Sequence, residues 1–372
     1  MKLLIVSTAP IIYKDQVPFA YSPYVNELVV LEKFADEFMF CCPVWEKENG
    51  LLITKIPFPI KKHFKLIDFS LSSFANILKA FFFSFYNILV LFRAMKNADH
   101  IHLRCPGNIG LLVCFVQVFF PSKKKTAKYA GNWDPESKQP FSYKLQKKIL
   151  SNTFLTRNMQ VLVYGDWQNQ SKNIKPFFTA TYANAEKETI QKTSLDTTIE
   201  FIFVGSLAPG KNPLYAIQLV HELLEKGYHA TLSLFGEGNE RTSLENYIRT
   251  HNLEKQVFLH GNQNQETVKR AYQKSHFVIL PSKSEGWPKA IAEGMFWGCV
   301  PIASKVSCVP FMLDYGQRGL LLEMNPEQDI NQIREILENP ESFSAKSNLA
   351  LEWSQNYTTD VFETEIKKLL SK

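Results

Sequence analysis

Short apolar runs alternate with longer helical stretches along most of this 372-residue chain. A short apolar run bounded by turn residues is typical of a buried strand in a parallel sheet. Strand–helix–strand order that is repeated along a chain predicts a doubly wound parallel sheet with helices on its faces. The alternation therefore places the chain in the α/β class.

The alternation occurs in two sets, which predict two domains. The first set has strands at 2–9, 38–45, 100–105, 126–133 and 159–165, and helices at 22–35, 71–97 and 109–120. The second set has strands at 200–205, 230–236, 256–261, 276–281, 300–304 and 319–323, and helices at 212–226, 240–251, 265–274 and 351–370. The polar segment 180–200 has no continuous apolar period and predicts a connection between the domains.

We therefore predict one Rossmann-like domain at 1–190, a second at 197–350, and a C-terminal helix at 351–372 that packs back towards the first domain. The predicted fold class is α/β, with two Rossmann-like doubly wound domains facing each other across a cleft. Such sheets bind ligands at the carboxyl ends of their strands, so the site is expected there. Because this architecture serves many functions, the function has to be argued from side chains.

Cysteine usage and hydropathy favour a reducing compartment. The six cysteines show no Cys-x-x-Cys spacing, so no disulfide or zinc framework is expected. The N-terminal apolar run is short and ends in Thr-Ala-Pro, which favours a first strand over a signal peptide. No window of about 20 residues is free of charged and polar groups, so no transmembrane helix is expected. These features predict a cytoplasmic protein.

Positive charge is concentrated in one part of the chain. Residues 51–150 carry 16 Lys and Arg against four Asp and Glu, although the net charge of the whole chain is only +6. Two clusters adjoin aromatic-rich helical stretches: Lys61, Lys62 and Lys65, and Lys123, Lys124 and Lys125. Basic residues beside exposed aromatic residues suit an anionic membrane surface, which predicts a peripheral protein of the inner membrane face. The alternative is a solvated face beside a buried helix. No recognised motif supports a nucleic-acid partner.

Two carboxylates stand in an apolar stretch of the second half, SEGWPKAIAEGMFWG. Burying an unpaired carboxylate costs several kcal/mol, so Glu285 and Glu293 are expected to bind something. The loop before Pro288 lies at the carboxyl end of a predicted strand, where a helix start attracts anions and Gly286 allows close approach. Carboxylates repel phosphates but accept hydrogen bonds from hydroxyls. The layout therefore predicts a nucleotide sugar, with its phosphates at the helix start.

A second predicted part of this site is FVGSLAPGKNPLYAIQL. Gly205 ends a predicted strand, and Lys211 lies just before a helix, from where its ammonium group can reach a diphosphate. Lys289 offers another positive charge. Alternatively, both lysines are solvated, and Gly236 in the sequence Gly-Glu-Gly marks a simple turn.

Together these segments resemble the donor site of the retaining glycosyltransferases of family 4, which have the GT-B fold. The resemblance rests on Glu285 and Glu293 in PSKSEGWPKAIAEGMFWGCVPIAS, and on FVGSLAPGK, LFGEG, VFLHG and HFVILPS in the family's order. It implies that Glu285 contacts hydroxyls of the transferred sugar and Glu293 the ribose. It also implies that Lys211 neutralises the diphosphate and that the Gly286-Trp287 turn presents backbone N–H groups to the donor.

The chain departs from the family pattern at several positions. The family usually has an arginine where Ser206 stands, and we expect Lys289 to replace that charge. The loop after the first strand lacks the usual glycines, and Gly131-Asn132-Trp133 stands where many members have a histidine. His102 resembles another histidine of the pattern and is therefore predicted to be catalytic together with Glu285 and Lys211, although a packed core histidine is the alternative.

The resemblance implies transfer of a sugar to a hydroxyl acceptor with retention, in the synthesis of a polysaccharide or glycolipid. No metal or other cofactor is expected, since no Asp-x-Asp pair of the metal-dependent kind is present. A nucleotide-sugar epimerase of the same fold and a non-catalytic binding module are alternatives. An NAD-dependent oxidoreductase is disfavoured, because no Gly-x-Gly-x-x-Gly follows the first strand.

Overall fold

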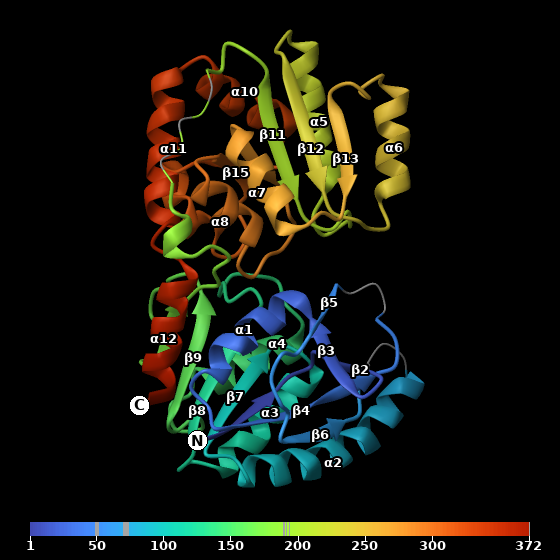
Figure 1. Cartoon of the computed structure of the whole chain (residues 1–372), viewed down its shortest axis with the longest axis vertical. Coiled ribbons are helices and arrows are strands. Elements are labelled where there is room, and N and C mark those ends of the chain that lie inside the picture. The colour runs from blue at the N-terminus through green and yellow to red at the C-terminus, as the bar shows by residue number, and fades with distance from the viewer. Residues whose placement is uncertain (49–51, 70–73, 189, 191, 193, 372) are drawn as a thin grey trace. The chain divides into compact units, whose positions relative to one another are not determined.

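The computed structural model describes the chain except for residues 49–51, 70–73, 189, 191, 193 and 372. The chain forms two compact units (Figure 1), one of Met1–Phe177 with Glu363–Lys372 and one of Phe178–Phe362. The division therefore falls a few residues before the polar segment 180–200. The last ten residues return to the first unit, where Lys33 and Lys175 form ion pairs with Glu363 and Glu365, each with an N–O distance of 2.5 Å.

The first unit has a mainly parallel sheet in the order β10-β9-β8-β7-β1-β4. These strands are β1 (Lys2–Val6), β4 (Glu37–Trp45), β7 (His100–Cys105), β8 (Lys124–Tyr129), β9 (Met159–Tyr164) and β10 (Ile174–Phe177). The sequence did not reveal the four short strands at the β4 side, which are β2 (Ile11–Lys14), β3 (Val17–Tyr21), β5 (Ile53–Lys55) and β6 (Lys62–Leu66). Most of their residues are exposed or only partly buried, so these short strands lack the long apolar runs that mark the central strands.

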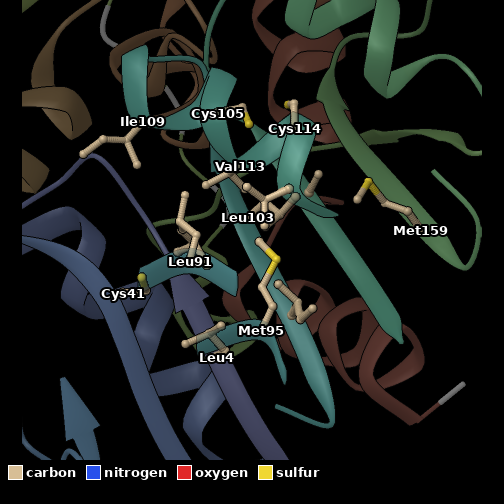
Figure 2. Packing of buried hydrophobic residues seen from close by; sticks show 14 of the residues in the cluster. Leu4, Cys41, Leu91, Met95, Leu103, Cys105, Ile109, Val113, Cys114 and Met159 are labelled. Carbon is tan, nitrogen blue, oxygen red and sulfur yellow. The ribbon is translucent and has the colours of Figure 1, made fainter. Parts of the chain in front are cut away.

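Helices flank the sheet of the first unit, and three of them contribute to its main core. The helices are α1 (Ser22–Glu32), α2 (Phe74–Lys96), α3 (Asn108–Val116), the 3-10 turn η1 (Gln117–Phe119), α4 (Phe141–Leu150) and α12 (Thr359–Ser371). Figure 2 shows Leu91 and Met95 of α2 and Val113 of α3 gathered around Leu103 of β7. Because side chains alternate across a strand, residues 100, 102 and 104 lie on the opposite face of the sheet.

The second unit has a six-stranded parallel sheet in the order β13-β12-β11-β14-β15-β16. Its strands are β11 (Ile199–Val204), β12 (Ala230–Phe235), β13 (Val257–Gly261), β14 (Phe277–Leu280), β15 (Val300–Ser304) and β16 (Leu320–Leu322). Its helices are α5 (Pro213–Glu225), α6 (Arg241–Thr250), α7 (Gln265–Lys274), α8 (Lys289–Phe296), α9 (Val309–Met312), α10 (Pro326–Leu337) and α11 (Pro340–Ser354). This is the Rossmann strand order, in which ligands bind where the order reverses, between the first and fourth strands.

Sequence predictions of secondary structure were wrong in detail at several places, and two of them concern packing. The helix expected at 351–370 is two helices, α11 and α12, separated by residues 355–358. The break suits packing, because Tyr357 in this link contacts the rings of Trp353 and Trp287. The strand expected at 126–133 ends at Tyr129, and the chain then turns so that Trp133 packs edge-on against Tyr129.

Candidate functional site

The loops after β11 and β14 adjoin each other at the point where the strand order reverses. The first loop runs from Gly205 to Asn212 and the second from Pro281 to Pro288. The backbone N–H of Lys283 donates to the carbonyl oxygen of Gly210 at 2.9 Å, which joins the two loops. The predicted site residues Gly205, Ser206, Lys211, Glu285, Gly286 and Trp287 therefore lie on two adjoining loops at the carboxyl end of the sheet. Lys289 and Glu293 follow on α8, and Gly236 lies on the loop after β12.

Lys211 and Glu285 form the central contact of this site. The Nζ of Lys211 lies 2.5 Å from Oε1 of Glu285. The Glu285 side chain is only 7% exposed, whereas that of Lys211 is 31% exposed. The ion pair explains how the nearly buried Glu285 carboxylate is stabilised. The Lys211 ammonium group is partly exposed and therefore places a positive charge at the surface of the site.

The glycine-containing loop after β12 packs tightly against the loop after β11. Gly236 has φ +139°, and a Cβ at this position would lie 1.9 Å from the carbonyl oxygen of Gly205. A Cβ on Gly238 would similarly lie 2.2 Å from the carbonyl oxygen of Leu207. Glycine is therefore required at both positions by the close approach of the two backbones, and this contact helps to position the loop that carries Lys211.

The turn at Gly286-Trp287 is held from two sides. Its Gly286 carbonyl oxygen accepts hydrogen bonds from Ser307 Oγ at 3.2 Å and Cys308 Sγ at 3.1 Å. The Trp287 indole is buried and stacks on Trp353, with ring centroids 6.1 Å apart. The indole is therefore a packing group, so only the backbone of this turn is available to a ligand.

Glu293 lies on α8 and has different partners from Glu285. It accepts hydrogen bonds from Thr181 Oγ1 at 2.7 Å and from the Tyr272 hydroxyl at 3.3 Å. Burial raises the pKa of the Glu293 carboxyl, and the Thr181 bond, the Lys289 ammonium and the Tyr272 bond oppose that rise. The two carboxylates are thus not paired with one another: one is held by a lysine, and the other by two hydroxyl groups.

Sequence reasoning missed several residues that support this site. Thr181 and Tyr272 orient Glu293, and Ser307 and Cys308 hold the Gly286 carbonyl. Thr181 is 112 positions from Glu293, and the other three are 21 or 22 positions from the groups that they contact, so no helix or strand spacing links them to the site. The clearest available signal was Gly210, whose carbonyl joins the two loops, since a glycine directly before Lys211 indicates a tight turn.

Residues 185–356, all in the second unit, match the family model described as Glycosyl transferases group 1. This unit is a glycosyl transferases group 1 domain. The match contains every residue of the site just described except Thr181.

Relatives of the group 1 domain include bacterial and archaeal glycosyltransferases. An uncharacterized glycosyltransferase of Methanocaldococcus jannaschii is 25% identical over 169 residues, which are 45% of this chain and 46% of that protein. The UDP-Gal:alpha-D-GlcNAc-diphosphoundecaprenol alpha-1,3-galactosyltransferase of Escherichia coli is 30% identical over 128 residues, 34% of this chain and 33% of that protein. The chain thus spans less than half the length of these curated relatives.

Similarity of structure extends over the whole chain. The crystal structure of Anabaena HepE in complex with UDP and glucose has a TM-score of 0.69 at 14% identity, with 100% of both chains covered. The fold is therefore that of the GT-B glycosyltransferases, which confirms the predicted fold class of two Rossmann-like units. At this level of identity the similarity concerns the fold alone.

His102, in the first unit, is packed inside the fold. It lies in β7, is 2% exposed, and its Nδ1 is 2.8 Å from Thr126 Oγ1 of the neighbouring strand. Burial and the nearby Arg104 lower the pKa of His102 to about 3, so the ring is neutral. This environment favours the alternative of a packed core histidine over the predicted catalytic role, because the ring is enclosed between strands.

A charged cluster that the sequence did not reveal lies on the same face of that sheet. Glu27 of α1 accepts from Arg104 Nη1 at 2.5 Å and from Lys128 Nζ at 2.7 Å. The Tyr24 ring lies under the Arg104 guanidinium, with 4.3 Å between Cζ and the ring centroid. This cluster ties α1 to β7 and β8.

The basic clusters are only partly on the surface. Lys61, Lys62, Lys65 and Lys124 are exposed. Lys123 is partly buried and donates to the carbonyl oxygen of Ala98 at 2.6 Å. Lys125 corrects the prediction: it is 2% exposed, and its Nζ donates to Gln117 Oε1 and to the carbonyl oxygen of Phe120, both at 3.0 Å.

Proposed function

We propose that this protein is a retaining glycosyltransferase that moves a sugar from a nucleoside diphosphate sugar to a hydroxyl group of a glycan or lipid-linked acceptor. The observation that carries the proposal is the contact between Lys211 and Glu285 at the strand-order reversal of a group 1 domain. The donor has an anionic diphosphate and a hydroxyl-bearing sugar side by side. A lysine can bind the diphosphate, and a carboxylate beside it can accept hydrogen bonds from the sugar hydroxyls.

Donor binding exchanges the partners of this pair. The Lys211 ammonium turns from Glu285 to the diphosphate, and the freed Glu285 carboxylate accepts hydrogen bonds from hydroxyls of the transferred sugar. Each charge keeps a partner throughout, so neither is left unpaired in a poorly hydrated place. The backbone N–H groups at the start of α8 and the Lys289 ammonium add positive potential for the phosphates. They compensate for the arginine that the family usually has at the position of Ser206.

The reaction breaks the bond between the anomeric carbon and the diphosphate oxygen. The acceptor oxygen forms its bond to that carbon on the same face, and the acceptor proton passes to the departing phosphate oxygen. Negative charge grows on the diphosphate in the transition state, so a cation already placed there lowers the barrier. Lys211 has this role, and Glu285 holds the sugar while it becomes positively charged.

Glu293 binds the ribose of the donor in this proposal. Thr181 and Tyr272 fix its carboxylate by hydrogen bonds, and the free lone pairs accept from ribose hydroxyls. Lys289, one turn earlier on α8, stabilises the ionised carboxylate. Gly205 and Gly236 contribute backbone groups, and a Cβ on Gly236 would overlap the carbonyl oxygen of Gly205.

For the donor and acceptor we propose a UDP-hexose and a lipid-linked or polysaccharide hydroxyl. Support comes from the UDP and glucose in the HepE complex and from the galactosyltransferase of Escherichia coli, whose acceptor is a diphosphoundecaprenol derivative. We also propose that transfer needs no metal, because Lys211, Lys289 and the α8 start supply the positive charge. Transfer that persists in EDTA is the expected result, and restoration of activity only by a divalent cation would contradict it.

We propose that the protein acts at the cytoplasmic face of an anionic membrane, where a lipid-linked acceptor would be present. The exposed lysines at 61, 62, 65 and 124 support this placement.

The test of the enzymatic proposal is a thermal-shift comparison of UDP, GDP and ADP, followed by an assay of UDP release from UDP-glucose and UDP-galactose. Binding to the folded state raises the melting temperature, by mass action. We expect a rise with UDP that Lys211→Ala removes and Lys283→Ala, in the neighbouring loop, retains. A variant Lys211→Ala that binds and transfers like the parent would contradict the assignment. Conversion of the donor to another sugar nucleotide without an acceptor would identify an epimerase instead.

A further inference from the structure

Helix α2 of the first unit is apolar on both of its faces. One face belongs to the core, where Leu91, Ala94 and Met95 are fully buried. The other face is exposed and carries large apolar side chains along its whole described length, with Phe81 72%, Phe82 70% and Phe85 65% exposed. The remaining members of this exposed face are Leu78, Tyr86, Ile88, Leu89 and Phe92. Such an area is larger than the scattered apolar residues of an ordinary surface, and it indicates an interaction site.

The exposed face of α2 continues onto the turns at the amino-terminal ends of β8 and β9. Phe92 contacts Phe119 of η1, with ring centroids 6.4 Å apart, and Phe119 is 72% exposed. The turn after η1 is joined to the turn before β9 by a hydrogen bond of 3.0 Å from Asn158 Nδ2 to the carbonyl oxygen of Pro121. That second turn exposes Phe154, over which the Arg157 guanidinium lies at 4.8 Å.

Cations border this apolar surface. Lys79, Arg93 and Lys96 are exposed on α2 itself. Beside the two turns a cavity of about 680 Å³ opens at the amino-terminal ends of the strands. Its exposed cationic lining residues are Lys124, Arg157 and Lys172, whereas Lys125 lines it as a buried group bonded to Gln117 and Phe120. Ser122, Thr153 and Gln160 add neutral polar groups. Among the described residues that line it there is no Asp or Glu, so the cavity suits an anion.

We propose that the exposed face of α2, with the two aromatic turns, lies in the interface of an anionic bilayer, and that the cationic cavity takes the phosphate of a lipid headgroup. Aromatic and aliphatic side chains enter the acyl boundary while the flanking lysines and arginines meet the headgroups, as in interfacial helices. This inference rests on the proposed function, because it explains how the enzyme reaches a lipid-linked acceptor.

The helix lies in the membrane plane and does not cross the bilayer. By length and composition alone, residues 78–96 could span a membrane. However, Asn87 on the core face exchanges two hydrogen bonds with the backbone of Ile67, and Leu91 and Met95 pack against the sheet. Crossing the bilayer would remove α2 from the core of the first unit, so insertion is limited to the exposed face.

A second copy of the chain is the less favourable occupant. A twofold dimer through α2 would place the same surface on both sides of the interface. Lys79, Arg93 and Lys96 would then face an equally cationic surface, with no Asp or Glu in the described part of α2 to compensate. An anionic membrane satisfies both the apolar area and its positive border.

The test is co-sedimentation of the full chain with vesicles of phosphatidylcholine alone or of an equimolar mixture of phosphatidylcholine and phosphatidylglycerol. We expect binding to the mixed vesicles only. Lys124→Gln/Lys172→Gln should bind about thirty-fold more weakly, since each cation near an anionic surface contributes about fivefold. Phe81→Ser/Phe85→Ser should lose most binding even at low salt.

Matched controls distinguish the loss of the proposed membrane surface from a general effect of removing exposed lysines or aromatic rings. Lys226→Gln/Lys255→Gln removes two exposed lysines of the second unit, and Tyr315→Ser removes an aromatic ring that is 76% exposed there. Both should bind vesicles like the parent. All variants should keep the melting temperature and the UDP-dependent thermal shift, which tests the donor site independently of the membrane.

Three outcomes would overturn the proposal. One is equal binding by parent and both surface variants, and another is no binding of the parent to mixed vesicles. The third is a dimer in solution that Phe81→Ser/Phe85→Ser dissociates while vesicle binding stays absent, which would assign the face to a second copy. If UDP does not raise the melting temperature while vesicle binding is intact, the proposed donor site is rejected and the proposed membrane surface is retained.

Discussion

The Lys211 ammonium lies 2.5 Å from the Glu285 carboxylate and joins the loops that follow the first and fourth strands of the group 1 domain. Each residue is the electrostatic partner of the other. The pair has a consequence for stability as well as for catalysis, because the carboxylate is nearly buried and the ammonium is not.

Removing only Lys211 should destabilise the domain. In Lys211→Ala the Glu285 carboxylate is left without its cation, and we expect the free energy of unfolding to fall by about 2 kcal/mol, below the 3–5 kcal/mol typical of fully buried pairs because Lys211 is partly exposed. Urea titration measures the change. Lys211→Ala/Glu285→Gln should recover most of the loss, and a double variant that is no more stable than the single one would show that the pair is not coupled.

Glu293→Gln should stabilise the protein at neutral pH. Burial raises the pKa of Glu293, so its stability contribution is complete below the pKa of an unfolded glutamate, about 4.3, and is lost as the pH rises through the folded pKa. Glutamine does not ionise, so the melting temperature of the variant should exceed that of the parent at pH 7.5 and approach it near pH 4.5. The UDP-dependent shift should weaken in the same variant. Glu254→Gln, at an exposed position, should show neither effect.

Gly236→Ala should disrupt the site by steric conflict. Its Cβ would lie 1.9 Å from the Gly205 carbonyl oxygen, and the backbone at φ +139° is unfavourable for any side chain. We expect a loss of about 3 kcal/mol or more in unfolding free energy, together with loss of the UDP shift. Gly227→Ala is the matched control, since Gly227 also has positive φ, +87°, but no neighbour within 4 Å of the added carbon. That control should cost only about 1 kcal/mol, and an equal effect of both substitutions would refute the steric explanation.

Lys125 should give stability a dependence on alkaline pH. Burial lowers its pKa to about 8, so its contribution is fully present above the unfolded pKa of about 10.4 and is lost as the pH falls through 8. The unfolding free energy of the parent, compared with that of Lys125→Met, should therefore rise between pH 8 and pH 10. Curves of unfolding free energy against pH that are parallel for the parent and Lys125→Met would contradict this. The control Lys124→Met, at the exposed neighbouring position, should give a curve parallel to that of the parent.

The amino-acid sequence by itself determined the α/β class, the central strands of both units and the neighbourhood of the candidate site. This was possible because a strand buried on both faces needs a continuous apolar run, as in FIFV of β11 and FVIL of β14, and such runs are readable locally. The spacing of Glu285 and Glu293 was likewise a local signal, since carboxylates stand out in an apolar stretch.

Only the tertiary structure decided which charges are paired and which are free. Lys211 and Glu285 are 74 positions apart, and Thr181 and Glu293 are 112 apart, so no local pattern reveals that they touch. In the same way Lys124 and Lys125 are adjacent in sequence, yet one is exposed and the other is enclosed by Gln117 and Phe120. Burial and pairing depend on the neighbours that folding brings from distant segments, and a single sequence does not specify them position by position.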